Sequence, residues 1–192
     1  VPNSASVDEN IGPVKKWIAD ELDAGRISGP FTLERINRIA RGPIYCSALL
    51  VVVTESAPGV PKYRICQNFS KGDKSSDTPA INDMTTKTDY PCRLDTATHI
   101  ADWVANAPDG TLGCPIDLTA FHRGIPLHPH HKPYGVFRLG DDFYFPHTNS
   151  FGMSPASSHA GQIGEPIRQR LEHEGFDPTF RYEDDFHACI SP

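Results

Sequence analysis

The feature that most constrains the fold is a pair of adjacent aspartates in the run Tyr182-Glu183-Asp184-Asp185-Phe186. Apolar residues flank the acids on both sides, which is typical of two short strands joined by a tight turn. We therefore expect a hairpin over residues 179–190. Two carboxylates at such a turn can hold a divalent cation, although a pair of aspartates is also common in solvated turns.

A third acid is needed to complete a cation site, and Asp117 is the candidate. It ends the short apolar run Cys114-Pro115-Ile116 and is followed by Leu118. An aspartate in this position lies where a strand exposes its last side chain to a cleft. Hard oxygen ligands of this kind suit Mg²⁺, which keeps several waters and is completed by substrate phosphates.

Further motifs stand in a fixed order around these acids. Lys62–Ser70 reads as a strand with basic residues, Ile116–Pro129 as an aspartate strand followed by a short helix and an Ile-Pro step, and Ser150–Ala156 as a Phe-Gly turn that opens a helix. Together with Tyr182–Asp185, they resemble the motifs of a reverse transcriptase of the kind carried by retroelements. The resemblance covers the fingers and palm, from about Lys15 to Phe186, and its four motifs together are specific.

The resemblance implies an α+β fold in which an antiparallel sheet is backed by helices. It implies RNA-directed DNA polymerase activity, in which deoxynucleotides are added to the 3′-end of a primer with two Mg²⁺ ions, or Mn²⁺ in their place. Asp117 and Asp184 would be the principal catalytic metal ligands, with Asp185 as a supporting acid. The implied partners are a nucleic acid template–primer and deoxynucleoside triphosphates.

Substrate-binding residues also follow from the resemblance. Lys62 and Arg64 would hold the triphosphate, and they share one face of a strand because side chains alternate with period two. Without the other motifs, both are equally well explained as solvent-facing charges. Phe121 and His122 occupy the sugar position, and Phe151 and Gly152 precede the helix that grips the template.

Several residues depart from the family pattern. His122 stands five positions after the first aspartate, where the family usually has an aromatic residue that excludes a 2′-hydroxyl, and Glu183 replaces an apolar residue. Ser150 and Ala48 replace prolines, and no thumb, primer grip or nuclease region is recognisable. The alternative function is therefore a non-catalytic nucleic-acid-binding or interaction module derived from a reverse transcriptase.

Composition is compatible with one compact domain or two small subdomains of a soluble protein. The chain has 192 residues, of which 38% are hydrophobic and 22% charged, and its net charge is −6. Phosphate binding usually demands a basic surface, so a basic groove must be local, for example at residues 62–76. Five cysteines without a Cys-x-x-Cys pair indicate free thiols and an intracellular, cytoplasmic or nuclear location. The longest apolar run, Ala48–Val53, is too short to span a membrane.

The sequence predicts a flexible lead-in at 1–12, a fingers-like region at 13–93 and a palm-like region at 94–192, without a thumb. Within them we expect helices starting at Pro13, after Thr32 and after Asp95, the last capped by that aspartate. Hairpins are expected at 47–68 and 134–147. A helix near 155–174 contains Gly161, Gly164 and Pro166, which predict a kink or a division into two.

A group of histidines offers a different interpretation. His128, His130 and His131, with His122 nearby, resemble a transition-metal cluster, because imidazole binds zinc and copper. Their spacing in a proline-rich loop lacks the helical i, i+4 pairing of common zinc sites, so a polar loop is the better explanation. A histidine-dependent zinc protein of unrelated fold is the third hypothesis.

Overall fold

The computed structural model describes the backbone of residues 1–192 and every side chain except that of Lys87. The chain divides into two compact units. Unit 1 comprises Val1–Thr86 and Pro126–Ser154, and unit 2 comprises Lys87–Ile125 and Pro155–Pro192. Residues 126–154 belong to unit 1 because their strands pair with N-terminal strands.

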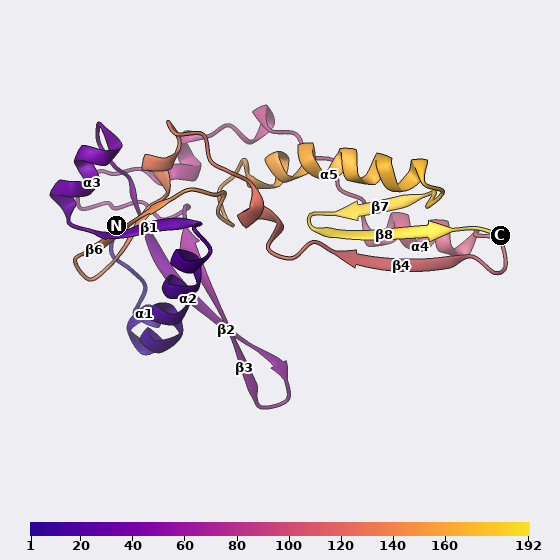
Figure 1. The fold of residues 1–192 in the computed structure, drawn as a ribbon, viewed down its shortest axis with the longest axis horizontal. Coiled ribbons are helices and arrows are strands. Elements are labelled where there is room, and N and C mark those ends of the chain that lie inside the picture. Colours follow the sequence, from indigo (N-terminus) through magenta and orange to yellow (C-terminus); the bar gives the residue numbers. More distant parts are fainter. The chain divides into compact units, whose positions relative to one another are not determined.

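Unit 1 is built on a five-stranded sheet in the order β1-β6-β5-β2-β3. Neighbouring strands are antiparallel except for the pair β2 and β5, which is parallel. The strands are β1 (Ile27–Phe31), β2 (Cys46–Ala57), β3 (Val60–Asn68), β5 (Val136–Leu139) and β6 (Asp142–Pro146). The helices of this unit are α1 (Ala5–Glu9), α2 (Ile11–Asp23) and α3 (Leu33–Ala40), with short 3₁₀ helices η1 (Ile81–Met84) and η4 (Lys132–Gly135). Figure 1 shows β2 and β3 continuing as a two-stranded ribbon past the rest of their sheet.

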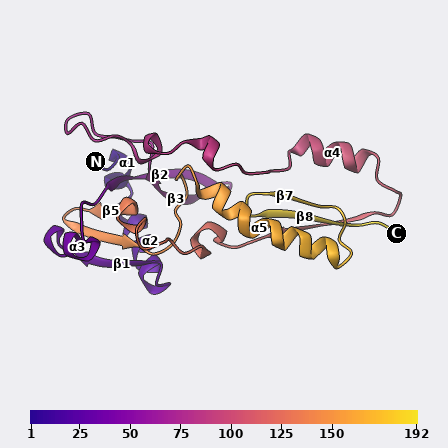
Figure 2. The same cartoon turned by 90° about the horizontal axis from the view of Figure 1, so that it is seen from above.

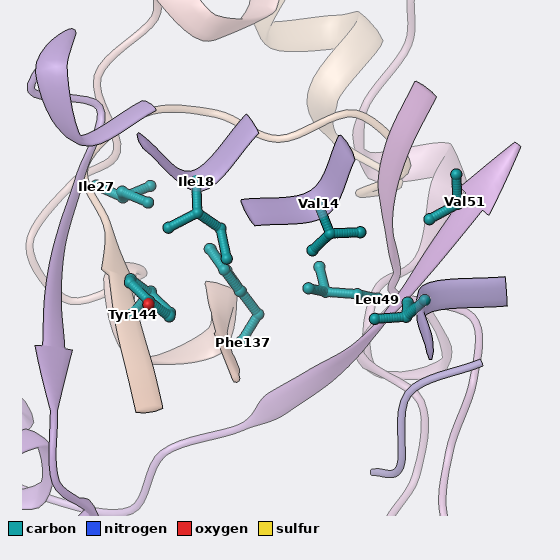
Figure 3. Close-up of a cluster of buried hydrophobic side chains, with 8 residues drawn as sticks. Val14, Ile18, Ile27, Leu49, Val51, Phe137 and Tyr144 are labelled. Carbon is teal, nitrogen blue, oxygen red and sulfur yellow. The ribbon is translucent and has the colours of Figure 1, made fainter. Parts of the chain in front are cut away.

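Two apolar clusters form the core of unit 1, one on each face of the sheet. On one face, Val14 and Ile18 of α2 pack against Leu49, Phe137 and Tyr144 (Figure 3). On the other face, Ile36 of α3 packs against Val136, Phe143 and Phe145, which are the strand neighbours of Phe137 and Tyr144. The alternation of burial along β5 and β6 therefore places consecutive residues in different clusters.

The N-terminal residues differ from the expected flexible lead-in. Val7 in α1 is fully buried, and the Ser4 N–H donates to the Leu49 carbonyl at 2.9 Å. Burial of a valine side chain contributes on the order of 2 kcal/mol, which is enough to hold a short helix that is weak by itself. The segment 1–12 thus contributes Val7 to the core of unit 1.

Unit 2 is a three-stranded antiparallel sheet in the order β4-β8-β7, covered by helices. Its elements are β4 (Leu112–Asp117), β7 (Thr179–Tyr182), β8 (Asp185–Ile190), α4 (Ala97–Ala105), α5 (Ala156–His173), η2 (Lys87–Asp89) and η3 (Phe121–Gly124). Trp103 of α4 contacts Phe180 of β7, whereas Arg181 lies against α5. Because adjacent strand residues point to opposite faces, α4 and α5 cover opposite faces of the sheet, as Figure 2 shows.

Two details of unit 2 correct the sequence expectations. The helix α5 is not divided in two, because it runs unbroken from Ala156 to His173 with Pro166 in its interior. The cap of α4 is Thr96, whose hydroxyl accepts from the His99 N–H, rather than Asp95. Asp95 instead accepts from the Arg181 N–H at 2.9 Å. Its carboxylate therefore stabilises the edge of β7.

No helix in the described part of the chain is long and apolar enough to cross a membrane.

Candidate active site at the acid turn

The aspartates of the two motifs meet at one end of the sheet in unit 2. Asp117 is the last residue of β4 and is paired directly across the strands with Asp185, the first residue of β8. The Leu118 N–H donates to the Asp184 carbonyl at 3.1 Å, which extends the pairing by one step. Residues that are 67 positions apart in sequence (117 and 184) are thus neighbours. Directly opposed strand residues direct their side chains to the same face, so the carboxylates of Asp117 and Asp185 share one face of the sheet.

The acid turn, which we define as Glu183 and Asp184 between paired Tyr182 and Asp185, has a constrained backbone. Glu183 has φ of 54°, in the left-handed region that residues other than glycine and asparagine avoid at a cost of about 1–2 kcal/mol. Short hairpin turns require such a conformation because it matches the twist of the flanking strands. The turn therefore needs support from its surroundings.

Support comes from η3, the short helix after Asp117. The Nε2 of His122 lies 3.2 Å from the Oε2 of Glu183. His122 is 1% exposed and the Glu183 side chain is 24% exposed, so the contact is largely shielded from water. The two motif residues that depart most in polarity from the family pattern are therefore in contact. This contact was not predicted from the sequence because it joins positions on separate elements.

Phe121 and His122, the expected residues of the sugar position, are both buried. Their rings lie edge to face with centroids 6.0 Å apart. The 3₁₀ turn of η3 starts after Ala120, which has φ of 52°. This tight turn directs the segment after Asp117 back along unit 2, where α5 contacts η3.

Lys62 and Arg64 lie on β3 in unit 1, outside the unit that carries the acids. They are paired with Thr54 and Val52 of β2, and both are exposed. Their register places both side chains on the same face of the ribbon formed by β2 and β3. A phosphate chain could therefore contact both cations together.

Phe151 and Gly152 also belong to unit 1, where they lie next to the end of β3. Gly152 has φ of 92°, and an added Cβ would lie 3.2 Å from the Gln67 carbonyl oxygen. Asn82 holds this segment, since its Nδ2 donates to the Gly152 carbonyl at 2.8 Å and its Oδ1 accepts from the Ser154 N–H at 2.9 Å. Asn82 was missed by sequence reasoning, and a lone asparagine in a turn-rich segment gives no signal that would identify it.

Mg²⁺ fits the acids by donor chemistry, because all are carboxylates and they are exposed or half-buried. Among the residues that the structure describes, no group of three or more His, Cys, Asp or Glu side chains is arranged to hold a metal ion. Mg²⁺ commonly uses only one or two protein carboxylates and takes its remaining ligands from water and substrate phosphates. Asp117 at the end of β4, together with Asp184 and Asp185 at the acid turn, would hold it.

The histidine segment of unit 1 has a different character. His128 contacts both His130 and His131, with ring centroids 5.0 and 5.7 Å apart, and the His130 N–H donates to His128 Nδ1 at 3.3 Å. All three rings are exposed. These contacts are those of a polar surface loop.

The chain has a reverse-transcriptase-like fold, as comparison with solved structures shows. Over its whole length it matches prototype foamy virus protease–reverse transcriptase in the native form, with a TM-score of 0.61 and 14% identity. It also matches a foamy viral protease–reverse transcriptase in complex with double-stranded DNA, with a TM-score of 0.61 and 12% identity. The chain covers 21% and 27% of those two chains. No protein-family model matches the sequence, and no curated protein matches it significantly.

Proposed function

We propose that this chain is the fingers and palm part of an RNA-directed DNA polymerase, with unit 1 as the fingers and unit 2 as the palm. The observation that carries the proposal is the pairing of Asp117 with Asp185 and of Leu118 with Asp184 at one strand end. Two aspartate motifs from distant parts of the sequence meet there, within a fold similar to that of reverse transcriptases.

The residues of the chain would divide the work as follows. Asp117 and Asp184 would hold the cations, and Asp185 would contribute negative charge from the same face as Asp117. Bound Mg²⁺ would stabilise the attacking 3′-oxygen and the leaving pyrophosphate of an in-line displacement. Lys62 and Arg64 bind the triphosphate through charge-assisted hydrogen bonds. The substrates are deoxynucleoside triphosphates and a template–primer.

The opposed acids also give a physical reason for cation binding. Like charges directly across an antiparallel pair destabilise a sheet. A divalent cation held by these carboxylates would offset that repulsion. The chain is therefore expected to be more stable with Mg²⁺ than without it.

Incorporation of a single nucleotide tests the proposal. The substrate is a self-priming RNA–DNA hairpin at low salt, because an acidic chain binds nucleic acid weakly at high ionic strength. We expect Mg²⁺-dependent incorporation that falls at least about 100-fold in Asp117→Asn and Asp184→Asn. Asp141→Asn, in the exposed turn between β5 and β6, is the matched control and should retain activity. Equal activity in all variants would overturn the proposal.

The second candidate is a nucleic-acid-binding module without polymerase activity. The contact between His122 and Glu183 favours it, because both polar residues replace the types that the family usually has at the nucleotide pocket. Binding of the hairpin without incorporation, unchanged by Asp117→Asn, would support this candidate over the polymerase.

A further inference from the structure

Arg181 is a buried cation directly beneath the acid turn. It lies on β7, two residues before Glu183, and is 3% exposed. Its Nη2 donates to the Arg93 carbonyl at 2.7 Å, and its Nη1 lies 3.5 Å from the Glu183 carbonyl, at the limit of a hydrogen bond. Among the residues that the structure describes, no carboxylate forms an ion pair with this guanidinium. Its charge is compensated by carbonyl oxygens instead.

The helix α5 is shaped to accept this side chain. Gly161 and Gly164 are three residues apart and therefore lie on one face of the helix. A Cβ built on Gly164 would lie 2.8 Å from Arg181 Cδ, and one on Gly161 would lie 3.3 Å from Nη2. Glycine weakens a helix interior. The two glycines therefore cost helix stability, and the space that their missing side chains leave is filled by Arg181.

A second set of bonds fixes the backbone of Arg181. Its N–H donates to Asp95 Oδ2 at 2.9 Å, and its carbonyl accepts from the Asp95 N–H at 2.9 Å. The segment Arg93–Asp95 therefore binds both the main chain and the side chain of Arg181. A side chain anchored in this way has little conformational freedom. Its packing against α5 therefore fixes where the guanidinium meets the Glu183 carbonyl.

We propose that Arg181 is a positioning residue of the acid turn. Seated on the glycines of α5, its guanidinium supports the Glu183 carbonyl in the left-handed conformation and so fixes the peptide that presents Asp184. This inference rests on the proposed function, in which Asp184 holds a cation. Arg181 is buried and acts through the turn, so it contacts neither substrate nor primer.

Hydrogen exchange on the full chain tests the geometry without any requirement for activity. The reporter is the Leu118 N–H, which donates to the Asp184 carbonyl, and the reference is the Cys189 N–H, which donates to Pro178 at the far end of the same sheet. In Arg181→Lys, which keeps the charge but loses the planar guanidinium, we expect exchange at Leu118 to accelerate at least tenfold more than at Cys189. Phe180→Leu, on the opposite face of β7, is the control and should accelerate both amides similarly.

If Arg181→Lys accelerates exchange at Leu118 and Cys189 by a similar factor, Arg181 has a merely structural role and the inference is overturned. An unchanged exchange rate at Leu118 would also overturn it. Gly164→Ala supplies a second variant that leaves Arg181 in place but displaces its side chain, and it should reproduce the selective effect at Leu118. If neither variant affects Leu118 selectively, the positioning role is wrong.

Nucleotide incorporation then connects the turn to the reaction. In Arg181→Lys we expect kcat to fall at least tenfold while the KM for nucleotide changes less than threefold, because the triphosphate ligands on β3 are untouched. A fall in nucleotide affinity alone would contradict the inference. If Asp117→Asn leaves incorporation unchanged while the exchange effect persists, the proposed function fails and the support of the turn by Arg181 stands.

Discussion

At the scale of single residues, the acid turn combines a strained backbone with a shielded polar contact. Glu183 occupies the left-handed region at φ of 54°, and its carboxylate lies 3.2 Å from buried His122. Considered separately in the sequence, His122 and Glu183 are two departures from a family pattern. In the structure they form one contact between η3 and the acid turn, so a change at either residue affects the other.

Replacement of Glu183 by the apolar residue of the family pattern is therefore expected to destabilise the protein. Glu183→Val removes the partner carboxylate of a buried imidazole and places a β-branched residue at positive φ. Together these effects should lower the free energy of unfolding by about 2–4 kcal/mol. Glu183→Gly removes the same carboxylate but relieves the backbone, so it should cost at least about 1 kcal/mol less. Urea unfolding measures both, and equal losses would show that the backbone of residue 183 is unstrained.

The basic pair on β3 gives a second prediction at this scale. Lys62→Ala and Arg64→Ala should each weaken nucleoside triphosphate binding about tenfold, as expected for loss of a charge-assisted hydrogen bond. Because both side chains are exposed, the free energy of unfolding should change by less than about 1 kcal/mol. Lys15→Ala, an exposed lysine on α2, is the control. Unchanged nucleotide affinity in both variants would assign the pair to the solvated surface.

At the scale of elements, His147 joins three parts of unit 1. Its Nε2 lies 2.5 Å from the Ser28 hydroxyl on β1, and its Nδ1 lies 3.1 Å from Lys132 Nζ at the start of η4. An ammonium group only donates, so Nδ1 accepts and the ring is neutral with its proton on Nε2. Ser28 Oγ therefore accepts a hydrogen bond, which is the wrong polarity for activation of a serine nucleophile.

This arrangement predicts a pH dependence for unit 1. Burial, and secondarily the Lys132 charge, lowers the pKa of His147 below its ordinary value of 6.5. Between that lowered pKa and 6.5 the unfolded chain binds a proton that the folded chain does not, so stability falls as pH decreases through this window and is constant above it.

Urea unfolding at pH 7.5 and 5.5 measures the effect in a Trp103→Phe background, where Trp17 alone reports on unit 1. His147→Gln should reduce the loss of stability on acidification, whereas His173→Gln, at an exposed histidine of α5, should not. A pH dependence that is the same in both variants would exclude His147 as its source.

Most elements could be predicted from local patterns, and the exceptions have physical causes. Thr32 does cap α3, and the hairpin expected over 179–190 is formed by β7 and β8. The strand β1 was not predicted because Gly29-Pro30 is typical of a turn. Proline is tolerated there because β1 lies at the edge of the sheet, where its missing N–H does not deprive a neighbouring strand of a hydrogen bond. Asp95 was expected to cap α4, but its carboxylate finds the Arg181 N–H, a partner 86 residues away.

In the candidate site, too, the residues of local sequence motifs could be predicted, whereas a residue whose role depends on long-range packing could not. Asp117, Asp184 and Asp185 could be singled out because their motifs and order are visible in the sequence. Arg181 could not, since a basic residue between Phe180 and Tyr182 gives no indication that it is buried. Only the glycines of α5 hinted at it. With Pro166 they predict a kink or a division of the helix, and in the structure they make room for the Arg181 side chain.

At the scale of the whole molecule, the chain passes from unit 1 to unit 2, returns for residues 126–154 and then completes unit 2. This path separates the proposed work: the acids and Arg181 lie in unit 2, whereas Lys62, Arg64 and Gly152 lie in unit 1.

The proposed function requires that Asp117 and Asp184 act together as ligands of at least one divalent cation. Iron-mediated cleavage tests this proposal: Fe²⁺ replaces Mg²⁺, added hydrogen peroxide is reduced by the bound Fe²⁺ to hydroxyl radicals that cut the nearby backbone, and ascorbate regenerates Fe²⁺. We expect cuts next to residue 117 and next to residue 184, both suppressed by excess Mg²⁺. Both cuts should be lost in Asp117→Asn and in Asp184→Asn, whereas Asp141→Asn should be cut like the unsubstituted chain. Cuts at only one of the two positions, or cuts at residue 184 that persist in Asp117→Asn, would contradict the proposal.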